Sequence, residues 1–160
     1  MTDWAESGTK APDFTLTDDQ GKQVSLKQFS DQPVVLYFYP KDDTPGCTKE
    51  ACGFRDLRDE LAELGAVVLG ISGDTVASHQ KFREKYKLNF PLLADEGFRV
   101  SQLYGAYREK NMYGKKSMGI QRSTFLIDGN RKIIRVWKRV KVEGHDQEVL
   151  AALRELIETE

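Results

Sequence analysis

Two cysteines lie five residues apart in this chain, and their surroundings favour chemistry at the first. Cys47 directly follows the polar turn Thr44-Pro45-Gly46, where an apolar run has ended and a helical pattern begins. Backbone N–H groups at the start of a helix lack intrahelical acceptors, and the helix dipole places positive charge there. Both favour the thiolate, which is the nucleophilic form of cysteine. From position alone, a buried and inert cysteine is the alternative.

The period of an α-helix separates the two thiols. At about 100° per residue, Cys47 continues the apolar stripe formed by Ala51, Phe54 and Leu61, whereas Cys52 lies about 140° away from Cys47. We therefore expect Cys47 to face the core and Cys52 to face outward or sideways.

The same spacing limits how these thiols can pair. Five residues along an intact helix separate two Cα atoms by about 8.5 Å, whereas a disulfide needs roughly 4.4–6.8 Å. A bond between Cys47 and Cys52 therefore requires the first turns of the helix to unwind.

Two other uses of paired cysteines fit the sequence poorly. A zinc site needs about four ligands, and His79 and His145, the other soft donors, lack metal-site spacing to the cysteines. Thiol–disulfide exchange proteins use Cys-x-x-Cys, but four residues separate Cys47 from Cys52 here. Simple structural cysteines remain an alternative at this point.

The elements that position the thiols follow from hydrophobic periodicity and turn residues. We expect buried strands over 34–39 and 66–72, and an extended segment over 89–93. We expect helices over 47–64, 75–86 (capped by Asp74) and 146–158, and helical turns over 96–104. The remaining segments are an N-terminal hairpin (13–18 and 23–26), an exposed, mobile loop (106–119) and a second hairpin (123–128 and 132–138).

This order predicts an α/β protein with a thioredoxin-like fold. A strand–helix–strand–helix half is followed by an antiparallel hairpin and a helix, which indicates a central mixed β-sheet flanked by helices. The N-terminal β-hairpin is an extension to that fold. The length of 160 residues fits one domain over 1–160.

Composition argues against nucleic acid and membranes as partners. The chain has 24 Lys+Arg against 25 Asp+Glu, a net charge of −1, so it carries no basic excess for phosphate groups. No stretch approaches the roughly 18 apolar residues of a membrane span, and the start lacks the apolar run of a signal peptide. We expect a cytoplasmic protein. Such a compartment keeps thiols reduced, so a permanent disulfide is not expected.

The segment Tyr37–Cys52, YFYPKDDTPGCTKEAC, resembles the active-site segment of peroxiredoxins. More narrowly, it is similar to the bacterioferritin comigratory protein, or peroxiredoxin Q, branch. The core of the motif is Pro40, three residues, Thr44, two residues and Cys47. The resemblance continues through 67–72, 89–95 and 111–128 and so covers nearly the whole chain.

The resemblance implies a role for five residues. Cys47 would be the peroxidatic thiolate that becomes a sulfenic acid, and Thr44 would bind the peroxide. Pro40 would shield the site from water, Arg122 would stabilise the thiolate, and Glu50 would orient that arginine. Without the resemblance, Arg122 would be an ordinary strand-end charge and Thr44 an ordinary turn residue.

The resemblance also implies how the enzyme is recycled. Cys52 matches the resolving cysteine of many members, which gives an intramolecular disulfide. Thioredoxin is the expected reductant, with glutaredoxin-type systems as the alternative, and the branch tends toward monomers. No metal, haem or flavin cofactor is implied.

Three other functions remain alternatives to that of a thiol peroxidase. The first is a thioredoxin-like protein disulfide oxidoreductase that acts on protein substrates. The second is a peroxide-sensing or chaperone-type binding protein in which oxidation of Cys47 changes the partner. The third is a purely structural domain, in which Cys47 only packs.

Overall fold

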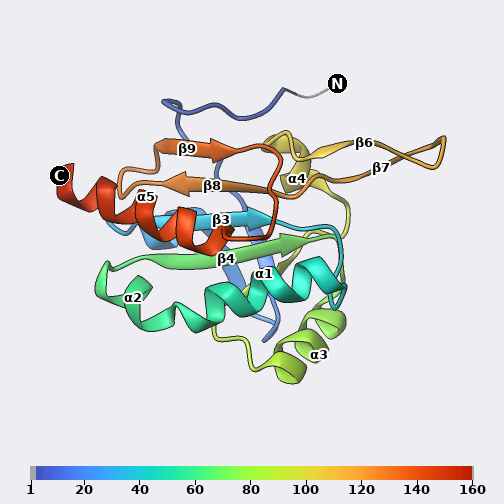
Figure 1. Ribbon diagram of the computed structural model, residues 1–160, viewed down its shortest axis with the longest axis horizontal. Coiled ribbons are helices and arrows are strands. Elements are labelled where there is room, and N and C mark those ends of the chain that lie inside the picture. The colour runs from blue at the N-terminus through green and yellow to red at the C-terminus, as the bar shows by residue number, and fades with distance from the viewer. Residues whose placement is uncertain (1–2, 160) are drawn as a thin grey trace.

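A seven-stranded mixed sheet forms the centre of the protein in the computed structural model, which describes residues 3–159 (Figure 1). Its strand order is β2-β1-β5-β4-β3-β8-β9, with β3, β4 and β5 parallel and the other pairings antiparallel. The strands are β1 (Thr15–Asp18), β2 (Gln23–Ser25), β3 (Val34–Phe38), β4 (Val67–Ser72), β5 (Leu92–Ala94), β8 (Ser123–Ile127) and β9 (Ile133–Trp137).

Strand β3 occupies the middle of the sheet because all five of its residues are β-branched, aromatic or leucine and are buried. It pairs with β4 in parallel and with β8 in antiparallel. Alternate residues of β3 enter two separate cores: Val35 and Tyr37 face one, and Leu36 and Phe38 face the other.

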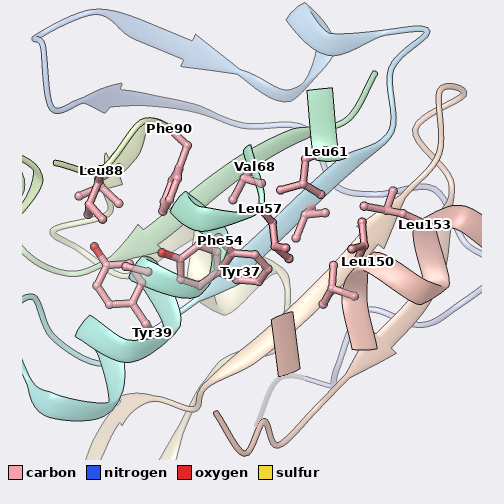
Figure 2. Close-up of a cluster of buried hydrophobic side chains, with 14 of the residues drawn as sticks. Tyr37, Tyr39, Phe54, Leu57, Leu61, Val68, Leu88, Phe90, Leu150 and Leu153 are labelled. Atoms are coloured by element: carbon pink, nitrogen blue, oxygen red, sulfur yellow. The ribbon is translucent and has the colours of Figure 1, made fainter. Parts of the chain in front are cut away.

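Helices cover the first of these cores. They are α1 (Pro45–Asp56), α2 (Arg58–Glu63), α3 (Val76–Tyr86) and α5 (His145–Thr159). Figure 2 shows Phe54 of α1 beside Tyr37 of β3, with Leu150 and Leu153 of α5 nearby. The second core is closed by the N-terminal segment, a 3-10 helix (Leu26–Phe29) and the short α4 (Arg99–Leu103).

The helix expected over 47–64 differs from the one observed. It begins earlier, at Pro45, because proline is well suited to the first helical position. It is also interrupted at Leu57, whose backbone (φ −91°, ψ 10°) ends α1 and starts α2. The cap of α3 was also predicted wrongly, since the Thr75 side chain, and not Asp74, accepts the hydrogen bond from the Ser78 N–H.

The expectation of a mobile loop over 106–119 is wrong. The segment forms an antiparallel hairpin of β6 (Tyr107–Met112) and β7 (Lys115–Ile120), which projects from the body of the protein (Figure 1). Its two-residue turn, Tyr113-Gly114, has positive φ at both positions, which matches the twist of a hairpin. The strands carry charged and polar residues on both faces, so the sequence lacks the alternation that reveals a half-buried strand.

The remaining elements confirm the expected thioredoxin-like order, including the N-terminal hairpin, the β8–β9 hairpin and the C-terminal helix. Within residues 3–159, no helix is long and apolar enough to cross a membrane. Residues 1–2 and 160 of the expected single domain lie outside the described part.

Candidate active site

Cys47 is the third residue of α1, the helix that follows the central strand β3 along the chain. Its side chain is buried, with 1% exposure. Thr44 is the N-cap, and its carbonyl accepts the first helical hydrogen bond, from the Thr48 N–H at 2.8 Å. The thiol therefore lies at the positive end of a helix and inside a low-dielectric core, next to backbone N–H groups without helical acceptors. Cys47 and Cys52 are both free thiols.

Arg122 connects Cys47 to Glu50. One guanidinium nitrogen, Nη2, donates to Cys47 Sγ at 3.2 Å, and the other, Nη1, donates to Glu50 Oε1 at 2.7 Å. Arg122 lies between β7 and β8, and its side chain is only 15% exposed. Gly46 permits this approach, because a Cβ at that position would lie 3.1 Å from Nη2. Three of the residues expected from the family pattern, Cys47, Glu50 and Arg122, are thus brought together from distant parts of the chain.

Burial affects the pKa values of both ionisable partners in this cluster, Glu50 and Arg122. It raises the pKa of Glu50 to about 7, although Arg122 opposes the shift. Burial also disfavours the charge on Arg122, but Glu50 and Cys47 outweigh it and raise the pKa of the guanidinium. The second carboxyl oxygen, Glu50 Oε2, is buried with no hydrogen-bond partner in the described part of the chain. A proton on Glu50 lowers the cost of that burial.

Thr44 and Pro40 lie on the stretch of chain between β3 and Cys47. The Thr44 hydroxyl donates to the Lys41 carbonyl at 2.9 Å, so its lone pairs are left to accept a hydrogen bond from a ligand. Pro40 follows β3 and is exposed. Neither the binding role of Thr44 nor the shielding role of Pro40 is tested by these contacts, and both stay predictions.

Cys52 lies on the same helix as Cys47 and is half-buried. It borders a surface cavity of about 440 Å³, formed between α1 and the segment 142–146 that leads into α5. The burial of Cys47 and the partial exposure of Cys52 confirm the expected facing of the two side chains. Because α1 is continuous from Pro45 to Asp56, the unwinding needed for a disulfide stays a prediction.

The sequence did not indicate that Lys110 lies close to this cluster. It is a half-buried residue of β6 whose aliphatic chain passes beside Gly119. Burial lowers the pKa of Lys110, the positive charge of Arg122 lowers it further, and Cys47 opposes both. No sequence signal pointed to it, because the hairpin that carries it was expected to be a mobile loop.

Comparison with protein-family models matches residues 7–136 to the AhpC/TSA family. A putative peroxiredoxin Bcp from Coxiella burnetii is 55% identical over 148 residues, which cover 92% of this chain and 98% of that protein. Peroxiredoxin Bcp from Bacillus subtilis is 46% identical over 153 residues, covering 96% and 98% of the two chains.

Among solved structures, the bacterioferritin comigratory protein of Xanthomonas campestris, studied for alkyl peroxide reduction, superposes with a TM-score of 0.89. It is 39% identical, and the match covers 95% of this chain and 99% of that one. A peroxidoxin BcpB from Mycobacterium tuberculosis matches with a TM-score of 0.84 at 41% identity, covering 94% and 97% of the two chains.

Proposed function

Because the chain belongs to the AhpC/TSA family, in the peroxiredoxin Bcp branch, we propose that its thiol peroxidase activity is carried by Cys47, with Arg122, Thr44, Glu50 and Pro40 around it. The substrates are hydrogen peroxide and organic hydroperoxides. Cys52 then resolves the oxidised thiol, and thioredoxin returns the enzyme to its reduced state.

In the first step the Cys47 thiolate attacks one oxygen of the peroxide. A sulfur–oxygen bond forms as the oxygen–oxygen bond breaks, which leaves a sulfenic acid on Cys47 and an alkoxide or hydroxide that takes up a proton. Negative charge moves from sulfur to the departing oxygen during this step. A fixed guanidinium stabilises that charge, and the apolar surroundings strengthen the interaction.

The contact from Arg122 Nη2 to Cys47 Sγ, 3.2 Å, is the single observation that carries the proposal. It holds a permanent cation on a buried thiol at a helix N-terminus. A cysteine that served only to pack the core would need no such partner, and burying the guanidinium there would be a cost.

In the second step the Cys52 thiol attacks the sulfenic sulfur, and water leaves as the disulfide forms. A dithiol reductant then opens this disulfide by exchange. Thioredoxin is the proposed reductant. We also place the enzyme in the cytoplasm, as a monomer, where reduced dithiols are available.

The test follows peroxide consumption in a stopped-flow instrument with thioredoxin, thioredoxin reductase and NADPH. Wild type should turn over, Cys47→Ser should be inactive, and Cys52→Ser should form sulfenic acid once and then stall. Arg122→Met should slow the oxidation of Cys47 by about 100-fold, the usual effect of removing one stabilising donor.

Arg154→Lys, at an exposed position on α5, serves as the control for changing an arginine and should behave as wild type. Undiminished turnover in Cys47→Ser would overturn the proposal. A wild-type protein that exchanges disulfides with protein substrates but consumes no peroxide would point to an oxidoreductase instead.

A further inference from the structure

The chain between β3 and α1, here called the Cys47 loop (residues 39–46), carries a buried aspartate that sequence analysis did not single out. Asp42 is 8% exposed. Its Oδ1 accepts from the Tyr39 hydroxyl at 2.6 Å, and its Oδ2 accepts from the Ser78 hydroxyl at 2.8 Å. The same Oδ2 lies 2.7 Å from Nδ1 of His79. Ser78 and His79 both belong to the first turn of α3.

His79 is fully buried and has a polar partner at each ring nitrogen. Nε2 lies 3.1 Å from the carbonyl oxygen of Leu93, in β5. A backbone carbonyl oxygen and a carboxylate oxygen thus face the two ring nitrogens, one on each side of the imidazole. The imidazole thus spans from the sheet to the Cys47 loop, with no solvent to replace either bond.

Neighbouring contacts fix the loop backbone as well. The N–H of Asp42 donates to Asp74 Oδ2 at 2.8 Å. Asp43, which has a positive φ of 56°, accepts from Lys85 and from Tyr86, each at 2.7 Å. The first and last turns of α3 therefore hold two successive residues of the loop.

Thr44, the N-cap of α1, is the next residue along the chain, and Cys47 follows one turn later. The position of the thiol relative to Arg122 depends on where the loop enters the helix. A misplacement of about 1 Å in a reacting group can cost on the order of 100-fold in rate.

We infer that His79 is a positioning residue for the peroxidase reaction, because through Asp42 it anchors the Cys47 loop to α3 and so holds Cys47 against Arg122. The inference rests on the proposed role of Cys47 as the nucleophile. Asp42, Asp74 and His79 each have one possible ligand atom, and these three atoms lie within 4.8 Å of one another, a spacing that a metal ion could also use. Each of the facing atoms already has a protein partner, so the network is complete without an ion.

The test compares His79→Leu with His79→Asn. Leucine fills the space without donating, whereas the asparagine amide can occupy the place of Nδ1 and donate to Asp42. In a Cys52→Ser background, His79→Leu should slow oxidation of Cys47 by hydrogen peroxide about tenfold or more, and His79→Asn should recover most of the rate. The rate at which iodoacetamide alkylates Cys47 at pH 7 should show the same ranking, with His79→Leu slowest and His79→Asn close to the parent.

Asp19→Asn is the matched control. Asp19 is also a buried aspartate that ties α3 to the sheet, since it accepts from Arg83 at 2.9 Å and from the Leu92 N–H at 3.0 Å, but none of these bonds reaches the Cys47 loop. It should lower the melting temperature and leave both rates unchanged. Should His79→Leu not fold, Ser78→Ala removes a single hydroxyl from Asp42 and should slow both reactions by about two- to threefold.

Two outcomes would overturn the inference: a destabilised His79→Leu with wild-type rates, or an Asp19→Asn that is slowed as much as His79→Leu. Failure of the proposed function has a different signature. In that case wild-type Cys47 would not react with peroxide, whereas the alkylation rates would still rank the variants by the position of the thiol.

Discussion

At the scale of the residue, Arg122 contacts a thiol and a carboxyl group with two nitrogens of one rigid plane. A lysine would present all its donors from one nitrogen and lacks the fixed, planar pair of donors that the guanidinium offers. The two contacts span 75 and 72 residues of sequence, and no spacing rule connects positions so far apart. The helical period therefore predicts the inward facing of Cys47, whereas Arg122 entered the predicted site only through resemblance to a family.

Glu50 gives the site a dependence on pH. Burial raises its folded-state pKa to about 7 from an ordinary value of 4.5, so the folded protein holds this proton more tightly than the unfolded chain. The stabilising contribution is complete below pH 4.5 and is lost as the pH rises toward 7. Glu50→Gln removes the titration, so its free energy of unfolding relative to the parent should rise by up to about 3 kcal/mol across that window.

Thermal melts at pH 5, 6, 7 and 8 measure this change, in a Cys47→Ser background that removes the neighbouring thiol. Glu143→Gln is the control, because Glu143 is exposed and Lys49 lowers its pKa. The free energy of unfolding of Glu143→Gln, relative to the parent, should not rise over the same pH range. A flat or falling difference for Glu50→Gln would show that the buried carboxyl does not hold the proton.

At the scale of the element, the sequence predicted the strands and helices that bury apolar side chains and missed what depends on backbone detail. Strand β3 and helix α5 were expected within about two residues of their observed bounds. The break at Leu57 and the turn at Tyr113-Gly114 carry no strong local signal. Leucine is a good helix former, and Tyr-Gly is not among the dipeptides that mark a hairpin turn.

Helix α1 must partly unwind for Cys47 and Cys52 to bond, and its packing limits how far. Phe54 is 1% exposed, and its ring centroid lies 5.0 Å from that of Tyr37. Figure 2 shows the two rings side by side in the core. Keeping Phe54 in place preserves this buried contact, so unwinding should stop before it. Oxidation to the disulfide should therefore raise amide exchange at 48–53 and leave α2, at Arg58–Glu63, unchanged.

Hydrogen exchange with mass spectrometry compares the reduced and disulfide forms of the wild type. Cys52→Ser treated with the same peroxide is the control, because it oxidises at Cys47 but has no partner for a disulfide. Equal exchange at 48–53 in the two wild-type forms would contradict the unwinding. Increased exchange throughout α1 and α2 would show that Phe54 does not hold the remainder of the helix.

At the scale of the whole molecule, the site assembles where the parallel strands end. Cys47 follows β3, Arg122 precedes β8, which runs antiparallel to β3, and His79 stands on the helix after β4. Open α/β sheets place their sites at this edge. The contacts across this edge depend on how side chains of different elements pack together. Hydrophobic periodicity and residue spacing do not predict such contacts.

One chain supplies both cysteines from a single helix, so the complete catalytic cycle should need no second subunit. We expect the rate of disulfide formation after a peroxide pulse to be independent of protein concentration between about 1 and 100 μM, as for any unimolecular step, whereas an intersubunit bond that required association would speed up with concentration. Quenched samples on non-reducing gels, with light scattering of the same solutions, measure the rate and the oligomeric state together.

Mixing Cys47→Ser with Cys52→Ser provides the control, because each variant retains one of the two thiols. A covalent dimer formed in that mixture as fast as the wild-type disulfide would show that resolution occurs between chains.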